Sequence, residues 1–295
     1  MFRKVLLCIL LGVLGCRGQQ PTGMLSQYPS PMEEFIRPHD RVGGDEFNGN
    51  RMLLSGIFHR DPVLLLPTQE EIEPLDSVNL LIHFHGAEGV VGHALQQNHG
   101  WVGVAVNLGN GSKAYGSPLE RKESFDRLVA AVRQELSKPI RRIYLSGFSA
   151  GYGAVRAILR TENYLLIDGV LLLDGLHAGY LPVRTPIYQG GKIDEGDLEA
   201  FVRLASDAVI GERQFVLTHS SVFPGTFAST TECVDFLLRE VGASRSPWLN
   251  TGPLGMQQVG QSSKGKLQVL AFAGNTAPDH IDHLHGLFYF IGLLD

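Results

Sequence analysis

The amino-acid sequence predicts an α/β fold in which helices cover both faces of a mostly parallel sheet. Continuous apolar runs, typical of strands buried on both faces, recur at 78–84, 101–108, 167–174 and 267–272. Segments with helical spacing of apolar residues separate these runs, and parallel strands need such crossovers. The 295 residues, 44% hydrophobic and 19% charged, suit one globular domain. A net charge of -5 offers no basic surface, so we expect no nucleic-acid partner.

The first forty residues are predicted to lie outside this domain. Arg3 and Lys4 precede an apolar run over 5–14, and Gly15 and Cys16 follow it, which is the pattern of an export signal. The apolar run is about half the length of a membrane-spanning helix. Residues 13–16 resemble a bacterial lipobox, which implies cleavage after residue 15 and lipidation of Cys16. The alternative is a plain secretory signal, 1–15, in which Cys16 is incidental.

Residues 16–40, rich in Pro, Gln and Ser, are predicted to tether the lipid to a domain over 41–295. The expected location is therefore the cell envelope, facing away from the cytoplasm, with the membrane reached through the lipid on Cys16. Arg17 follows the cysteine, and by the same resemblance this favours the outer membrane or cell surface. Cys8 would leave with the signal, so Cys233 has no partner for an internal disulfide.

The domain is predicted to begin with a hairpin or edge strands over 51–66, where two apolar stretches flank Asp61-Pro62. The strand at 78–84 ends in a glycine-rich turn, His85-Gly86-Ala87. The strand at 101–108 follows, and then an amphipathic helix over 120–136 that Pro139 closes off.

The central stretch, 142–159, has the order strand, tight turn, helix. An apolar run leads into Gly147-Phe148-Ser149-Ala150-Gly151, and apolar residues at helical spacing follow. A serine on such a turn needs glycine at the flanking positions and stands above the carboxyl edge of the sheet. The amino terminus of the helix and the Ala150 N–H are then available to an oxyanion. The motif predicts a nucleophilic Ser149, and an ordinary Gly/Ser-rich turn is the alternative.

The rest of the chain continues the alternation. A strand over 167–174 ends in Asp174-Gly175, and a helix is expected over 198–208. A short strand over 215–218 ends in His219-Ser220-Ser221, and a helix over 230–241 follows. After the strand at 267–272, residues 274–285 are expected to precede a last helix. The insertion at 175–212 holds about one helix, which is too little for a large cap domain.

The order of an HG loop, a serine turn, an acid and a histidine near the carboxyl terminus resembles the α/β-hydrolase superfamily of serine esterases and lipases, from about residue 78 onward. The resemblance implies that the Ala150 and Ala87 N–H groups bind the oxyanion and that Gly86 lets its loop approach the acyl oxygen. It places the base after the last strand, where His280, His283 and His285 stand; His280 is favoured, with His283 as the alternative.

The acid and the substrate-binding residues complete the expected site. The commoner family position for the acid follows the 215–218 strand, where this chain has no carboxylate, so we expect Asp174, a position that some hydrolases use. Asp279 and Asp282, near the histidines, are the alternatives. We list three candidate substrate-binding residues by their positions at strand ends, where ligands collect: His85, Gly86 and His219. His219 and Ser220 could both hydrogen-bond the substrate, or they could bond each other.

These residues predict a serine hydrolase that cleaves carboxylic esters through an acyl-enzyme. Ser149 attacks, His280 transfers the proton, and Asp174 stabilises the imidazolium. No cofactor is expected, and no metal, because His280 and His283 have neither an HExxH motif nor a third ligand. The alternatives are an envelope-acting peptidase or amidase with the same triad, and a lipid-anchored binding protein on a hydrolase scaffold.

Overall fold

The computed structural model of the chain describes residues 47–294. The predicted signal, Cys16 and the tether lie outside the described residues and stay predictions of the sequence. Within the described part, no helix has the length and apolar character needed to cross a membrane.

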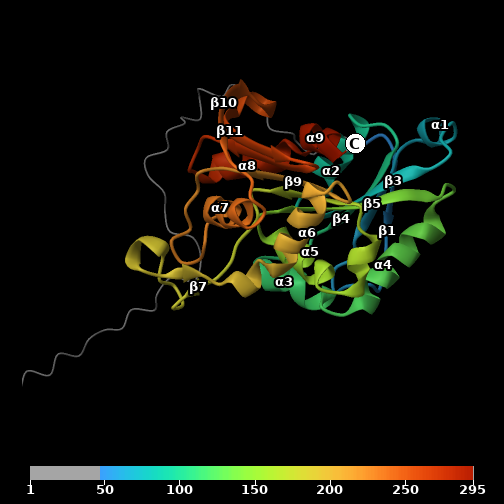
Figure 1. Cartoon of the computed structure of the whole chain (residues 1–295). Coiled ribbons are helices and arrows are strands. Elements are labelled where there is room, and N and C mark those ends of the chain that lie inside the picture. Colours follow the sequence, from blue (N-terminus) through green and yellow to red (C-terminus); the bar gives the residue numbers. More distant parts are fainter. Residues whose placement is uncertain (1–46, 295) are drawn as a thin grey trace, which may run out of the picture.

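A ten-stranded sheet forms the centre of the molecule (Figure 1), in the order β1-β2-β4-β3-β5-β6-β9-β12-β11-β10. Its six central strands are parallel: β4 (Trp101–Val106), β3 (Val78–Phe84), β5 (Ile140–Phe148), β6 (Gly169–Leu173), β9 (Gln214–His219) and β12 (Leu267–Phe272). Two antiparallel strands extend each edge: β1 (Asn50–Leu53) and β2 (Val63–Leu66) on one side, β11 (Gln257–Lys264) and β10 (Ser246–Thr251) on the other.

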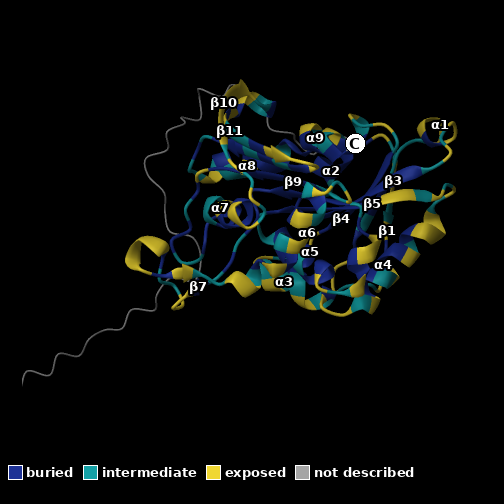
Figure 2. Cartoon of the chain, in the orientation of Figure 1, coloured by how far each residue is buried: buried dark blue, intermediate teal, exposed yellow. Residues whose placement is uncertain are grey.

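Two apolar cores lie on opposite faces of this sheet, because successive side chains of a strand point to opposite sides. In β3, Leu80 and Ile82 belong to one core and Leu81 belongs to the other. The larger core contains side chains of α4 (Lys122–Glu135), α5 (Tyr152–Leu159), α6 (Glu199–Val209) and α7 (Thr230–Glu240). The smaller core contains side chains of α2 (Glu88–Gln96), α8 (Ala277–His285) and α9 (Leu287–Phe290). Figure 2 shows the buried strands between helices whose outer faces are exposed.

The strand order and the serine-bearing turn between β5 and α5 give the chain the predicted α/β-hydrolase fold. β3 is followed in the chain by its neighbour on one side, β4, and then by its neighbour on the other side, β5. The order in which the chain adds strands to the sheet therefore reverses between β3 and β5, and ligands bind at such a switch point, beyond the carboxyl ends of the strands.

The insertion after β6 contains two short strands, β7 (Tyr180–Leu181) and β8 (Lys192–Ile193), and α6, so it forms no large cap. Polar contacts hold it against the body of the domain. Asp197 accepts hydrogen bonds from Arg156 at 2.7 Å and from the Gly179 N–H at 2.9 Å.

Two expectations about the carboxyl-terminal part are corrected. Residues 274–285 do not precede the last long helix; α8 already begins at Ala277, because Thr276 and Asp279 form a capping box at its amino terminus. The antiparallel pair β10 and β11 was not predicted. These two strands lie at the edge of the sheet, where most of their residues are not buried. Their sequences therefore contain no continuous apolar run that would predict a strand.

Candidate active site

Ser149 stands on a sharp turn directly after β5. Its φ of 45° is in the left-handed region, and a 3-10 turn over Ser149–Gly151 leads into α5. Close packing requires glycine around it: a Cβ atom on Gly151 would lie 2.2 Å from the Phe84 carbonyl oxygen, and one on Gly147 would lie 2.9 Å from the Gly151 carbonyl carbon. The turn therefore lies tightly against the end of β3, and Ser149 remains partly exposed.

Asp174 and His280 form a close pair next to this turn. His280 Nδ1 lies 2.7 Å from Asp174 Oδ2, although the residues are 106 positions apart in the chain. Gly175, which follows Asp174, packs closely against the backbone of Ser149. A Cβ atom on Gly175 would lie 2.6 Å from both the backbone N and the backbone O of Ser149. The rings of Phe148 and His280 are 4.6 Å apart. Among the described residues, no hydrogen bond joins Ser149 to His280.

The other candidates for acid and base have different neighbours. Asp279 Oδ2 accepts hydrogen bonds from the Thr276 N–H and hydroxyl, both at 2.7 Å, and so caps α8. His283 is fully buried, with Nδ1 2.7 Å from Thr218 Oγ1, and Asp282 is fully buried beside it. The carboxylate on His280 is therefore that of Asp174.

The loop after β3 lies against the serine turn. His85 stacks on Phe148 with ring planes 7° apart, and a Cβ atom on Gly86 would lie 2.6 Å from His83 Nε2. Ala87 is exposed at the N-cap of α2, and Ala150 lies in the first turn before α5. N–H groups at these positions have no partner within their own helix, so both are free to bind an anion.

One ring nitrogen of His85 and both ring nitrogens of His219 have partners in the protein. His85 Nδ1 lies 2.7 Å from the Tyr115 hydroxyl, which also lies 2.9 Å from Asn107 Oδ1. His219 Nδ1 lies 2.9 Å from the Ser220 carbonyl oxygen, and its Nε2 lies 2.8 Å from Arg245 Nη1. His219 thus has no free ring nitrogen for a substrate, whereas His85 has one.

Two residues of this region make contacts that the sequence does not predict. Ser220 donates its hydroxyl to Asp174 Oδ2 at 2.5 Å, and Tyr115 fixes the ring of His85. The sequence predicts Ser220 as a partner of the substrate or of His219, and not as a partner of Asp174. No local sequence pattern predicts either contact, because each contact joins segments that are far apart in the chain.

The electrostatics keep Asp174 ionised. Burial raises the pKa of its carboxyl group, but the charges of His283 and His280 and the hydrogen bonds from His280 and Ser220 outweigh burial, so the pKa is lowered overall. An ionised carboxylate only accepts hydrogen bonds, so His280 donates its Nδ1–H to it. This leaves Nε2 as the ring nitrogen that can act as a base when the imidazole is neutral.

Two buried histidines are expected to make stability depend on pH. Burial lowers the pKa of His83 to about 3 and that of His283 to about 4, whereas histidine in an unfolded chain titrates near 6.5. Between these values the unfolded chain binds more protons, so stability is complete above pH 6.5 and is lost as the pH falls. We expect the free energy of unfolding to fall by about 3 kcal/mol between pH 6.5 and pH 5 for the two residues together.

Urea unfolding at several pH values measures this loss, to which His177 adds its own share because burial also lowers its pKa to about 4. His283→Gln is expected to reduce the total loss by about 1.5 kcal/mol. A free energy of unfolding that stays constant between pH 7 and pH 5 would contradict the prediction.

Metal-ligating side chains are not gathered in the described part of the chain. No group of three or more His, Cys, Asp or Glu side chains in residues 47–294 is arranged to hold a metal ion. The one cysteine described, Cys233, is a buried free thiol.

Comparisons with known proteins give only remote structural similarities. No protein-family model matches the chain, and no curated protein matches it. An acylaminoacyl peptidase of Pyrococcus horikoshii is 13% identical with a TM-score of 0.48, and the match covers 82% of this chain and 40% of the peptidase. An esterase of Thermogutta terrifontis is 13% identical with a TM-score of 0.49, covering 84% of this chain and 92% of the esterase.

An S-formylglutathione hydrolase of Staphylococcus aureus is 12% identical with a TM-score of 0.46, covering 83% of this chain and 96% of the hydrolase. The chain spans about two fifths of the length of the peptidase and 60% of that of a thermostable esterase. These identities and TM-scores are too low to assign an activity, which has to be argued from the geometry of the site.

Proposed function

We propose that the chain is a serine hydrolase that cleaves carboxylic esters through an acyl-enzyme intermediate. The observation that carries the proposal is the 2.7 Å contact between His280 Nδ1 and Asp174 Oδ2, which lies beside the strained turn of Ser149. A serine hydroxyl is a weak nucleophile alone and needs a base that a third group orients. Ser149, His280 and Asp174 supply these three roles.

In the proposed reaction, Ser149 Oγ attacks the ester carbonyl while its proton passes to His280 Nε2. His280 then gives this proton to the departing alcohol, which leaves an acyl group on Ser149. In the second half of the reaction, water attacks the acyl group while its proton passes to His280. His280 then returns this proton to Ser149 Oγ as the acid leaves. Asp174 keeps the proton on Nδ1 and stabilises the imidazolium that forms in each step.

The oxyanion of each tetrahedral intermediate is proposed to accept hydrogen bonds from the Ala150 and Ala87 N–H groups. Both begin helices, whose amino termini favour negative charge. One such donor lowers the barrier by on the order of 3 kcal/mol. The close approach of Phe84 and Gly151 supports this role, because it brings the loop after β3 against the serine turn.

One sequence feature favours esters over amides as substrates, because Gly-Phe-Ser-Ala-Gly with a preceding His-Gly loop resembles secreted esterases. The insertion after β6 forms no large cap over the strand ends. We therefore propose that the site is open to bulky esters. A peptidase or amidase with the same triad is the second candidate, and the two are distinguished by the substrates that they cleave.

A fluorophosphonate probe tests the proposal on the full chain, because it reacts covalently only with an activated serine. We expect stoichiometric labelling of the wild type and none of Ser149→Ala. Ser221→Ala, which removes an exposed hydroxyl at the end of β9, is the matched control and is expected to label like the wild type.

A nitrophenyl ester and a nitroanilide with the same acyl group then compare the two substrate classes, and we expect the ester to be cleaved preferentially. A folded wild type that takes up no label would favour the non-catalytic binding protein instead. Preferential cleavage of the anilide would favour the peptidase.

A further inference from the structure

We propose that Ser220 is a positioning residue for the Asp174 carboxylate, and that His219 and Arg245 hold Ser220 in place. The inference rests on the proposed function, since the position of Asp174 affects turnover only if His280 acts as the base. It adds a role for the end of β9, where the sequence offers no carboxylate.

Ser220 donates a hydrogen bond to each carboxylate oxygen of Asp174, although the two residues are 46 positions apart in the chain. Its backbone N–H donates to Oδ1 at 3.0 Å, and its hydroxyl donates to Oδ2 at 2.5 Å. Both residues are almost completely buried, at 1% and 3% exposure, so water does not compete for these bonds. The carboxylate therefore cannot rotate without breaking at least one of them.

The direction of the Ser220 hydroxyl is fixed by a third contact. The Val222 N–H donates to Ser220 Oγ at 3.1 Å, so this oxygen already accepts one hydrogen bond and its own proton is free to point at Asp174. With the His280 Nδ1–H at 2.7 Å, Asp174 Oδ2 accepts two donors and Oδ1 accepts one. This arrangement aims Oδ2 at the imidazole ring.

His219 and Arg245 support Ser220 from the opposite side. Arginine only donates hydrogen bonds, so Arg245 Nη1, 2.8 Å away, makes His219 Nε2 an acceptor. The ring proton then lies on Nδ1, which donates to the Ser220 carbonyl oxygen at 2.9 Å. Burial and the Arg245 charge lower the pKa of His219, in keeping with a neutral ring.

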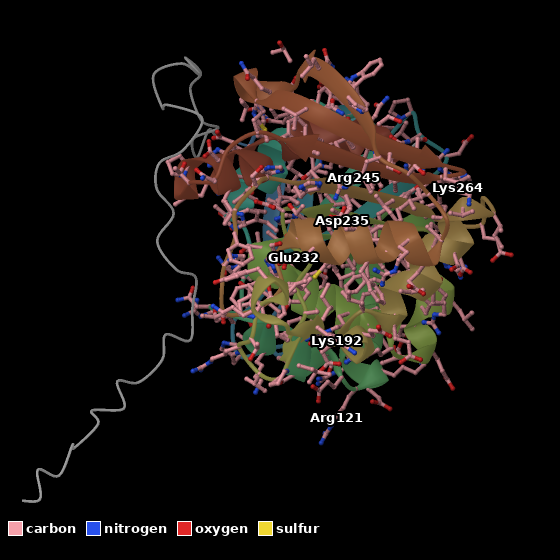
Figure 3. All side chains as sticks on the ribbon, turned by 60° about the vertical axis from the view of Figure 1, so that its left-hand side comes forward. Arg121, Lys192, Glu232, Asp235, Arg245 and Lys264 are labelled. Carbon is pink, nitrogen blue, oxygen red and sulfur yellow. The ribbon has the colours of Figure 1, made fainter. Side chains whose placement is uncertain are left out.

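The support ends at the protein surface. Arg245 Nε donates to Asp235 Oδ1 at 2.6 Å, and Figure 3 shows these two side chains together beside α7. The Thr231 hydroxyl, also from α7, lies 3.1 Å from the Ser220 carbonyl oxygen. A series of contacts thus runs from Asp235, which is exposed on α7, through Arg245, His219 and Ser220 to the Asp174 carboxylate.

The decisive comparison is Ser220→Ala against Ser220→Thr, because only threonine keeps a hydroxyl. We expect Ser220→Ala to lower kcat for the ester about tenfold, the usual effect of losing one bond to a charged group, with KM within twofold of the wild type. Ser220→Thr is expected to recover most of the loss, and the control Ser221→Ala to keep the wild-type kcat. A kcat unchanged in Ser220→Ala, or equally low in both variants, would overturn the proposal.

A proton NMR spectrum supplies a readout that does not need turnover. The Nδ1 proton of a histidine bonded to a buried carboxylate resonates far downfield, and we expect this signal to shift and exchange faster in Ser220→Ala. Unchanged position and exchange would overturn the proposal even in an inactive protein. If the wild type takes up no fluorophosphonate but the signal responds to Ser220→Ala, the proposed function fails while the positioning of Asp174 stands.

His219→Phe tests the outer part of the arrangement. We expect kcat about threefold lower in this variant and no further loss when it is combined with Ser220→Ala, because residues that act through one another are not additive. Full additivity of the two losses would show that His219 acts independently of Ser220 and would overturn its assigned role.

Discussion

His280→Ala is expected to lower kcat for the ester by about 10⁶-fold, the size of effect found when a triad base is removed. Without the imidazole, the Ser149 proton has no acceptor within reach, and the leaving alcohol has no donor. The matched change is His283→Gln, one turn further along α8. His283 is fully buried against Thr218, so this change is expected to lower the free energy of unfolding by about 1–3 kcal/mol and leave kcat within threefold.

Rates with the nitrophenyl ester and unfolding curves of both variants check this prediction. The opposite pattern, with turnover lost in His283→Gln and kept in His280→Ala, would move the base to His283. Loss of turnover in both variants at full stability would mean that the two histidines act together.

Asp174→Asn is expected to lower kcat by about 10⁴-fold while leaving the fold intact. The asparagine side chain has nearly the same shape, so the bonds from Ser220 can partly persist. Its amide group, however, does not hold the proton on His280 Nδ1 as the carboxylate does, and it carries no charge to stabilise the imidazolium. The loss should therefore appear in kcat rather than in KM.

Asp279→Asn is the matched control for this prediction, since Asp279 caps α8 through Thr276 instead of contacting His280. Its expected effect is a loss of about 1 kcal/mol in the free energy of unfolding, with kcat nearly unchanged. Steady-state kinetics and unfolding of both variants decide the matter. An Asp279→Asn protein that is stable but inactive would make Asp279 the acid.

The buried strands were the most predictable part of the fold. β3 and β12 have the predicted bounds, 78–84 and 267–272, because a strand covered on both faces must be apolar throughout. The edge strands carry no such signal, since β11 is polar almost throughout and every residue of β10 is exposed. α8 begins earlier than predicted, at Ala277, because Thr276 and Asp279 form its capping box before the apolar residues of the predicted helix.

The sequence predicts which residues belong to the candidate site better than it predicts the contacts between them. The glycines around Ser149 identify the turn, since their spacing is local in the chain. The contact of Asp174 with His280 joins positions 106 apart, and only the resemblance to a family suggested it. Ser220 and Arg245 had no comparable signal, because hydroxyl and guanidinium groups are common at strand and helix ends.

Three neighbouring strands share one feature that affects how this protein can change. β3, β5 and β6 are each followed by a residue that is not glycine and yet has a positive φ: 69° at His85, 45° at Ser149 and 42° at Asp174. Each such backbone costs about 1–3 kcal/mol, out of a net stability of about 5–15 kcal/mol for a typical domain. This edge of the sheet, which carries the proposed active site, is therefore where stability and the proposed activity compete most directly. Selection for heat resistance alone would favour glycine at all three positions and would remove the chemistry with the strain.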